Sequence, residues 1–496
     1  TVIGVPVYTD TVTQRDVALT PLPSGNLRGE ITDADSGAPL TATVTVSGTP
    51  RAATGSAYSF TLPAGTYVVR AAQVGHQFVT ATAVVTAGEV TTVDLALPGA
   101  PAVLLVDSGA WYYGSEIAFF RQALDDLTLS YDEWQIHTTP DDVPTASDLE
   151  PYDVVVWSDP TDGIGQIGAQ HAVEGYLSGG GRLFLTGQDI GYLDDGLDDY
   201  AYYRTLLKAG YVQNNAESWT LDGTPGGLFA GQTITITGPG GADNQFRPDV
   251  IEPIDPDSAA RVFTYHGAGC GGIRTGTCLD YRLVYLSFGF EAIDDRATRR
   301  DVMDRTLEWL TAPRPEAGIE LIPTPQPQIG RPGTQVSHTV RVRHLGQAGG
   351  LDTFDLSLEG ADWPSELSVP SLTLAPCTSD TVVISVTVPP TISWDARDVA
   401  TFTARSSVSP TVSQTMVLTS KAPAPVLLVD DDLFFEQLPI YRAAMEGAGI
   451  PYDEWQTCPA IGFCRNNPPP LEILRRYPIV VWWTGYDWHR PIWSNE

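Results

Sequence analysis

The sequence predicts a multidomain chain in which β-sandwich modules alternate with doubly wound α/β domains. Three observations indicate this architecture. A length of 496 residues suits roughly three to five domains. Stretches that alternate apolar and polar residues, typical of half-buried strands, are interrupted by continuous apolar runs followed by amphipathic helical patterns. One stretch of the second kind occurs twice, which indicates a duplicated domain.

The composition excludes several classes of protein. Hydrophobic residues make up 42% of the chain and charged residues 18%, which is typical of folded domains. The net charge is −32, from 60 acidic and 28 basic residues, and the only lysines are Lys208 and Lys421. Without a basic cluster, nucleic acid and anionic membranes are poor partners. No apolar run is long enough for a membrane span.

Changes of pattern place four boundaries along the chain. We expect terminal strands of a preceding β-domain, a first β-sandwich, an α/β domain, a second β-sandwich and the first part of another α/β domain, at residues 1–24, 25–100, 101–313, 314–422 and 423–496. The first assignment depends on residues 11–21, which resemble residues 90–98. The chain therefore reads as a slice of a longer polypeptide.

The longer duplication supports the last of these domains. Three segments recur in the same order and with similar spacing: PAVLLVD (101–107) as APVLLVD (424–430), YDEWQ (131–135) unchanged at 452–456, and YDVVVW (152–157) as YPIVVW (477–482). The repeated region thus covers residues 101–160. The YDEWQ pentapeptide is open to two interpretations, packing at the edge of a sheet or a binding motif.

Residues 25–100 alternate apolar and polar positions between turn signals. Gly29, the turn at 33–39, the strand at 42–46 and the Gly-Thr-Tyr at 65–67 make this segment similar to the carboxypeptidase regulatory-like family. The resemblance covers about 75 residues and implies a small, non-catalytic β-sandwich. The second sandwich resembles the immunoglobulin-like modules of bacterial secreted proteins, on its composition and its alternating strands.

The α/β domain contains buried strands at 103–107, 154–157, 182–186 and 282–290, and helices are expected from Ser115 and over 302–310. The run Gly179 to Asp189 and the run Tyr285 to Glu291 resemble the glutamine-amidotransferase-like (ThuA-like) domains. This resemblance implies a flavodoxin-like fold and a catalytic Cys at a strand-to-helix turn. That turn here reads Leu-Thr-Gly-Gln at 185–188, so we expect the fold without the reaction.

Other catalytic patterns are weak. Residues 163–168 form a G-x-G-x-x-G, but five residues separate them from the preceding strand, so we expect a loop rather than a dinucleotide site. His137 and His171 have no evident acid or nucleophile partner, so surface or packing roles are favoured. Motifs of serine hydrolases, zinc peptidases and P-loop enzymes are absent from the sequence.

Three carboxylates could hold a metal ion. Asp107, Asp159 and Asp189 are expected at the carboxyl ends of separate strands, where ligands of α/β sheets bind and where converging carboxylates suit Ca²⁺ or Mg²⁺. The alternative is that these acids cap turns and helices. The acidic runs at 194–199 and 243–257 are expected mostly as solvated loops.

The five cysteines indicate an oxidising environment. We expect local disulfides between Cys270 and Cys278 and between Cys458 and Cys464, because each pair is close in sequence and no zinc spacing is present. Cys377 is left over, either as a buried thiol or as a thiol that pairs with another chain. Abundant Thr in the first hundred residues suits strands or, alternatively, O-linked glycans.

Together these features favour a non-catalytic, secreted cell-surface protein. An unfinished sheet at one end and orphan strands at the other predict head-to-tail self-association into a homopolymer. Two alternatives remain open. The modules resemble accessory regions of secreted subtilisin-like peptidases, and the Trp residues between 482 and 493 could serve a carbohydrate-binding module.

Overall fold

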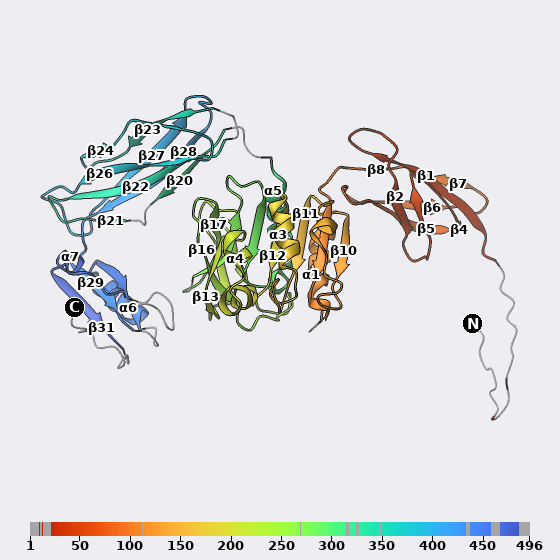
Figure 1. Cartoon of the computed structure of the whole chain (residues 1–496), viewed down its shortest axis with the longest axis horizontal. Helices are drawn as coiled ribbons and strands as arrows, with labels where there is room; N and C mark the ends of the chain where they lie inside the picture. Colours follow the sequence, from red (N-terminus) through yellow and green to blue (C-terminus); the bar gives the residue numbers. More distant parts are fainter. Residues whose placement is uncertain are drawn as a thin grey trace.

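The computed structural model describes residues 9, 12, 21–111, 114–267, 269–313, 317–323, 327–346, 350–432, 437–457 and 467–485. The chain is multidomain and consists mostly of β-sheet. Four units follow one another from the N-terminal to the C-terminal side of the molecule (Figure 1). The strands expected within residues 1–24 lie almost wholly outside the described residues. No helix within the described ranges is both long and apolar enough to cross a membrane.

The first unit is a β-sandwich, as the alternation predicts. Its strands are β1 (Ser24–Asp33), β2 (Ala42–Val46), β3 (Ala52–Gly55), β4 (Ala57–Pro63), β5 (Gly65–Ala72), β6 (Val79–Val85), β7 (Val90–Thr92) and β8 (Leu95–Leu97). One sheet has the order β4-β1-β7, with β8 also on β1, and the other has the order β3-β2-β5-β6. Alternate side chains such as Leu27, Val44 and Val69 are fully buried between the sheets.

The second unit is built on a parallel sheet. Its parallel strands are β9 (Val103–Asp107), β10 (Tyr131–Gln135), β11 (Val154–Ser158), β12 (Arg182–Thr186) and β19 (Arg282–Leu286). They lie in the order β10-β9-β11-β12-β19. The helical segments are η1 (Gly109–Trp111), α1 (Ile117–Asp126), α2 (Ala146–Leu149), α3 (Gln170–Ser178), η2 (Tyr192–Leu197), α4 (Ala201–Thr205), η3 (Phe290–Ala292) and α5 (Arg296–Thr311).

Both faces of this parallel sheet are covered, so its inner strands β9, β11 and β12 and its strand β19 are buried on both sides, whereas the outer strand β10 is largely exposed. Helices α1 and α5 cover one face, where Phe120 and Met303 share a core with Leu105 of β9. Helix α3 packs on the other face, against residues such as Trp157. The expected helix near Ser115 begins at Ile117, and the Ser115 hydroxyl accepts a hydrogen bond from the Ile117 amide at 3.2 Å.

An antiparallel extension continues the sheet beyond β19. It contains β13 (Ala209–Asn214), β14 (Thr220–Gly223), β15 (Thr233–Thr235), β16 (Asp249–Pro253), β17 (Ala259–Tyr265) and β18 (Cys270–Thr275). The order from β19 is β18-β17-β14-β15, and β16 joins β13 to β18. The whole sheet therefore has 11 strands, and only part of it follows the βα alternation expected from the sequence.

The third unit is another β-sandwich. Its strands are β20 (Ile319–Pro323), β21 (Gln328–Ile329), β22 (Gln335–His344), β23 (Asp352–Glu359), β24 (Ser365–Leu367), β25 (Ser371–Leu374), β26 (Ser379–Thr387), β27 (Arg397–Ser406) and β28 (Ser413–Lys421). The sheets are β20-β22-β26-β24 and β21-β28-β27-β23-β25. Their inner faces share one core that includes Val340, Phe354 and Phe402.

The fourth unit is a small parallel sheet. It contains β29 (Val426–Asp430), α6 (Leu438–Ala448), β30 (Tyr452–Gln456), α7 (Leu471–Leu474) and β31 (Ile479–Trp483), with the strand order β30-β29-β31. This is the order β10-β9-β11 of the second unit. The register also repeats, since Tyr131 pairs with Val103 and Tyr452 with Val426.

Side-chain contacts repeat with the strands. The pentapeptide YDEWQ is an outer strand in both copies, and its Glu pairs with an Arg on the preceding helix: Arg121 Nε to Glu133 is 2.7 Å, and Arg442 Nε to Glu454 is 2.7 Å. Its Trp donates to a loop carbonyl in both copies. These contacts support edge packing as the role of the pentapeptide.

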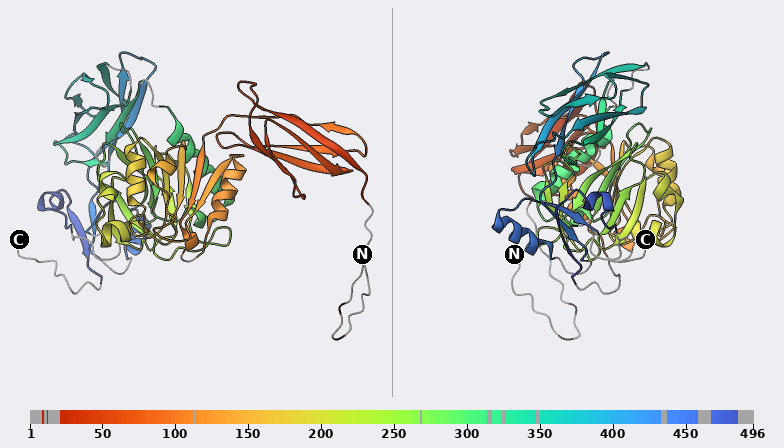
Figure 2. Two further views of the ribbon diagram at one scale, coloured as in Figure 1. Left: turned by 45° about the vertical axis from the view of Figure 1, so that its right-hand side comes forward. Right: turned by 90° about the vertical axis from the view of Figure 1, so that its left-hand side faces the viewer.

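Figure 2 shows the first sandwich projecting from one side of the α/β unit, with the second sandwich and the last unit on the other side. The first joint contains an ion pair between Arg70 and Asp125 at 3.3 Å and a β-bridge between Gln77 and Leu129. The last joint contains a buried ion pair between Lys421 of the second sandwich and Asp453 of the fourth unit. At both joints the neighbouring units are in direct contact rather than joined by linker alone.

Candidate functional site

Open α/β sheets bind ligands at the carboxyl ends of their parallel strands. In this protein, backbone atoms of a neighbouring loop fill the space beside the turn that follows β12. A Cβ atom at Gly187 would overlap the backbone oxygen of Asp159, so no side chain fits at this position. Beside it, Gln188 accepts a hydrogen bond from the Phe246 amide at 2.9 Å and donates one to the Pro160 carbonyl at 3.2 Å.

The glycine-rich turn at 163–168 surrounds a carboxylate of the same chain. The Gly165 amide donates to Asp194 Oδ2 at 3.0 Å, and the Tyr202 hydroxyl donates to the same oxygen. A Cβ atom at Gly163 would overlap the Asp194 carboxylate, and one at Gly165 would overlap the Tyr200 ring. The glycines are therefore needed for close approach of the chain's own side chains, as expected of a loop.

The three carboxylates predicted as metal ligands, Asp107, Asp159 and Asp189, do not share a common site. Asp107 accepts hydrogen bonds from the Ser115 hydroxyl and the Gly109 amide, and Asp159 accepts one from the Ser108 hydroxyl at 2.9 Å. Asp189 lies half-buried on the next loop. Within the part of the chain that the structure describes, no three His, Cys, Asp or Glu side chains are placed to hold a metal ion. The trio is not brought together as a cation site.

Buried acids are concentrated at this edge. Burial raises the pKa of Asp189 to about 6, although Arg247 acts in the opposite direction. Burial also raises the pKa of Asp194 to about 6 and that of Glu291 to about 7. The fully buried Asp159 has its pKa raised well above the ordinary value, for the same reason. Burial therefore makes each of these acids easier to protonate than the same acid in water, although Asp189 and Asp194 remain mostly ionised at neutral pH.

The expectation that the acidic runs are solvated loops is wrong for several of their members. Asp194 is fully buried, and Asp195 is 9% exposed. Asp195 accepts two hydrogen bonds from Arg204, at 2.5 and 2.9 Å, and one from the Tyr211 amide. Asp249 is also fully buried. Paired arginine and backbone donors offset the cost of removing these carboxylates from water.

The disulfide pairing expected from sequence is wrong for Cys270 and Cys278. Cys278 is bonded to Cys377, 99 positions away, and Cys270 is a free, fully buried thiol. Burial raises the pKa of Cys270 to about 12, so it is unreactive. Cys377 is therefore neither a buried thiol nor available to another chain. The expected pair Cys458 and Cys464 lies outside the described residues.

The disulfide joins the α/β unit to the second sandwich, and ion pairs surround it. Arg343 of the sandwich is 3% exposed and pairs with Asp257 at 2.8 Å and with Glu320 at 3.0 Å. Arg341 also pairs with Asp257, at 2.5 Å. The joint is thus held by a covalent bond and by charges from both units. The spacing of the cysteines in the sequence does not predict this pairing, because the bonded residues are 99 positions apart.

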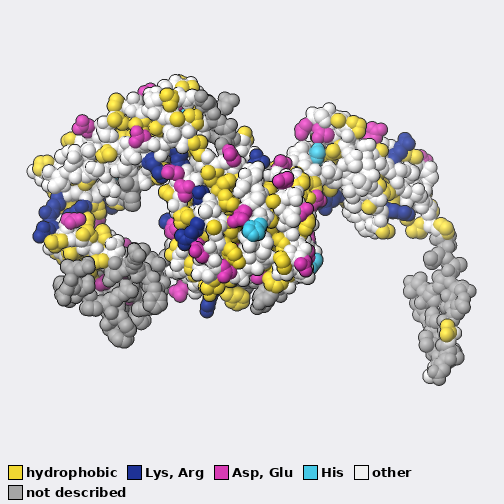
Figure 3. Space-filling view, in the orientation of Figure 1, with side chains coloured by type: hydrophobic (Ala, Val, Ile, Leu, Met, Phe, Trp, Pro, Cys, Tyr) yellow, Lys and Arg dark blue, Asp and Glu magenta, His cyan; other side chains and the backbone are white. Residues whose placement is uncertain are grey.

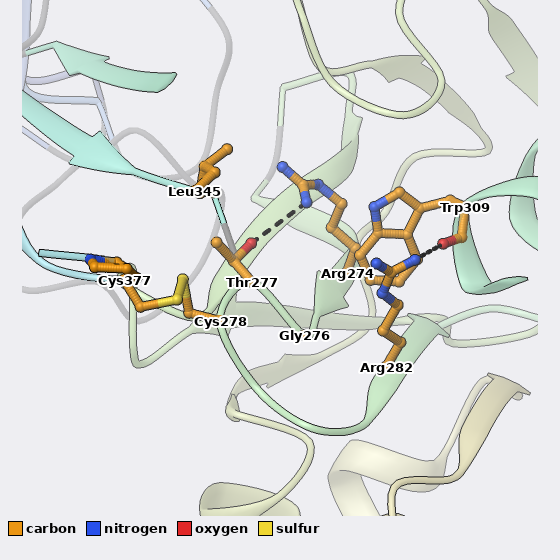
Figure 4. A pocket seen from close by; sticks show the side chains of 10 residues that line it. Arg274, Gly276, Thr277, Cys278, Arg282, Trp309, Leu345 and Cys377 are labelled. Atoms are coloured by element: carbon orange, nitrogen blue, oxygen red, sulfur yellow. Dashed lines mark hydrogen bonds between the residues drawn. A yellow bond between two sulfur atoms is a disulfide. The ribbon is translucent and has the colours of Figure 1, made fainter. Parts of the chain in front are cut away.

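A pocket of about 360 Å³ lies at this joint (Figure 4). Residues of both units line it: Arg274, Gly276, Thr277, Cys278, Arg282, Trp309, Leu345, Gly346, Pro376 and Cys377. Arg274 and Arg282 lie 5.5 and 5.4 Å from the centre of the Trp309 ring. The pocket is therefore cationic and aromatic on the α/β side and apolar on the sandwich side.

The strand β31 is at one edge of the sheet that the structure describes in the last unit. It pairs with β29 on one side, and no described strand pairs with its other side. In the second unit the same side of β11 is covered by β12. Ile479 and Val480 are accordingly 53% and 38% exposed, whereas Val154 and Val155 at the equivalent positions are fully buried.

A basic patch lies next to this strand. A pocket of about 240 Å³ between the second sandwich and the last unit is lined by Arg331, Arg475 and Arg476 together with Glu472 and neighbouring polar residues. Figure 3 shows Lys and Arg side chains gathered at this end of the molecule. In the second unit, a Glu and a Pro at 150–151 occupy the positions of Arg475 and Arg476. We call Arg331, Arg475 and Arg476 the basic patch.

Comparisons with known proteins add little. No family model matches the chain, and no curated protein matches it. Among solved structures, it is similar to a family 123 glycoside hydrolase from Clostridium perfringens (9% identity, 21% of this chain and 25% of that one, TM-score 0.16). It is also similar to a PapD-like domain of human CEP192 (14%, 23% and 87%, 0.18). A third is the Escherichia coli alpha-2-macroglobulin (16%, 23% and 18%, 0.19). Likenesses of this size carry no argument about function.

Proposed function

We propose that this protein is a non-catalytic, extracellular or cell-surface structural protein whose copies associate head to tail into a filament. The observation that carries the proposal is the edge of β31 that no described strand covers, called the open edge below. Unpaired backbone groups and half-exposed apolar side chains favour pairing with another strand. A contact between two different ends of the same molecule does not close on itself, so it propagates.

The α/β units are proposed to be flavodoxin-like scaffolds of the glutamine-amidotransferase type that have lost the reaction. The strand order β10-β9-β11-β12-β19 supports the fold. The closed turn at Gly187, where a nucleophile would be needed, supports the loss of activity. Surface glycans on Thr and Ser are compatible with this role.

An extracellular location is supported by the disulfide between Cys278 and Cys377, because such bonds persist in oxidising environments. The fixed joint between the α/β unit and the second sandwich also suits a load-bearing chain. A disulfide and the ion pairs of Arg341 and Arg343 with Asp257 resist separation of the two units.

Light scattering over a concentration series, with electron microscopy of the same samples, tests the proposal. We expect the mean mass of the native protein to rise with concentration and linear particles to appear. Val480→Lys places a charge on the open edge and should hold the protein as a monomer. A native protein that stays monomeric at the highest concentration would refute the proposal.

Val68→Lys is the matched control for this variant. Val68 is 43% exposed, close to the 38% of Val480, but it lies on β5 in the middle of a sheet. It pairs with Thr82 on one side, and its carbonyl accepts a hydrogen bond from the Ser47 amide on the other, at 2.9 Å. The same added charge should therefore leave association unchanged, because no open edge is altered there.

A further inference from the structure

The pocket at the joint contains a guanidinium with few hydrogen bonds. The Arg274 side chain is 23% exposed. Its hydrogen bond to the Thr277 hydroxyl is long, 3.5 Å, and its ion pair with Glu320 is 3.8 Å, beyond hydrogen-bond distance. A guanidinium has five N–H donors, and these two contacts involve only two of its nitrogens. The Arg274 guanidinium can therefore donate to a further acceptor.

The second arginine of the pocket is fixed by the fold. Arg282 Nη1 donates to the carbonyls of Trp309 and Ala312, at 2.5 and 2.7 Å, at the end of α5. Figure 4 shows both arginines next to the Trp309 ring. Two positive charges, those of Arg274 and Arg282, therefore lie beside the same pocket.

The charge of the lining is opposite to that of the whole protein. Among the described residues, two arginines and no acidic side chain line the pocket, in a chain with 60 acidic and 28 basic residues. On the opposite side, Leu345, Pro376 and the disulfide present an apolar surface. A volume of about 360 Å³ is at the lower end of the range for small-molecule sites.

We propose that this pocket binds a small organic carboxylate, with its carboxylate on Arg274 and its apolar part against Leu345, Pro376 and the disulfide. Arginine suits this task because its planar fork matches the two oxygens of a carboxylate. Because both units line the pocket, a bound molecule would contact both and strengthen the joint. The carboxylate could belong to a free acid or to an acidic side chain of another chain.

Calorimetric titration with benzoate, at constant ionic strength in chloride, tests the site. Benzoate should bind saturably, whereas benzamide, which has the same shape without the charge, should not. A blocked Gly-Asp-Gly peptide distinguishes the two sources. Binding of benzoate alone identifies a free acid, and tighter binding of the peptide identifies an acidic side chain.

Arg274→Gln should weaken the binding of the successful probe by at least about tenfold, the loss expected for a charge-assisted hydrogen bond. Arg274→Lys keeps the positive charge but lacks the planar fork, so its affinity for the probe should lie between that of the native protein and that of Arg274→Gln. Arg405→Gln, an exposed arginine of the sandwich, is the control and should bind as the native protein does. Equal affinity of Arg274→Gln and the native protein, or no saturable binding of either probe, would overturn the proposal. Thermal unfolding of each variant verifies that it is folded.

Discussion

Cys278 and Cys377 are bonded to each other across the joint between the α/β unit and the second sandwich, with their Cα atoms 5.5 Å apart. The bond joins positions 99 residues apart, so it restricts the unfolded chain much more than a local disulfide would. It also fixes the position of two units that otherwise meet through ion pairs. Its removal should therefore affect both stability and the relative freedom of the units.

The first prediction concerns the double variant Cys278→Ala with Cys377→Ala. Under non-reducing conditions it should lose about 4–5 kcal/mol of unfolding free energy, the loop-entropy value for a loop of this length. Denaturant unfolding measures the loss, and small-angle scattering should report a wider range of joint angles. Adding reductant to the double variant is the control and should leave the joint unchanged. An unaltered unfolding curve would contradict the prediction.

The second prediction concerns stability between about pH 4.5 and about pH 7. Burial raises the pKa of Glu291 from 4.5 to about 7, so the folded state holds a proton that the unfolded state releases as the pH rises. The contribution of Glu291 to stability should be greatest in acid and should fall through this interval, by an amount on the order of 3 kcal/mol. Glu291→Gln cannot ionise and should flatten the profile.

Unfolding measured at a series of pH values tests this prediction. Gln keeps the oxygen that accepts the hydrogen bond from Asn244, so the variant should fold. Glu150→Gln, at an exposed position of the same unit, is the control and should leave the slope unchanged. If Glu291→Gln unfolds with the same pH dependence as the native protein, Glu291 is not protonated in the fold.

The third prediction concerns the turn after β12. Gly187→Ala would place a methyl group in overlap with the Asp159 carbonyl oxygen, and backbone atoms leave little room to adjust. We expect a loss of about 1–3 kcal/mol or more. Gly447→Ala is the opposite control, because that glycine lies within α6 with nothing near its added methyl, so the change should be neutral or stabilising. Calorimetry distinguishes the two directions, and an unchanged Tm for Gly187→Ala would refute the closed turn.

The buried parallel strands could be predicted closely from the sequence. β9 and β12 have the predicted bounds, because a continuous apolar run is typical of a strand covered on both faces. The duplicated order β30-β29-β31 also follows from the repeated segments. In these regions the pattern of apolar residues along each segment agrees with the burial of that segment in the fold.

The remaining features depend on partners that are distant in sequence. Asp195 is buried because Arg204 and the Tyr211 amide satisfy it, and a run of acids by itself predicts solvent exposure. Cys278 pairs across 99 residues, so proximity in sequence is misleading. The antiparallel strands β13 to β18 contain few continuous apolar runs and several glycines, which leaves them without a clear period.

The last prediction rests on the proposed assembly and concerns Arg475 of the basic patch. In a chain with net charge −32, a local positive surface beside the open strand favours contact with an acidic surface of another copy. Association should weaken when salt rises from about 50 to about 500 mM, because exposed charges are screened. Arg475→Glu should weaken association at low salt and remove most of the salt dependence.

Arg28→Glu is the control, because it makes the same change in net charge at an exposed position of the first sandwich. Light scattering should find that it associates about as strongly as the native protein. Equal effects of the two variants would show that net charge, and not the patch, governs association.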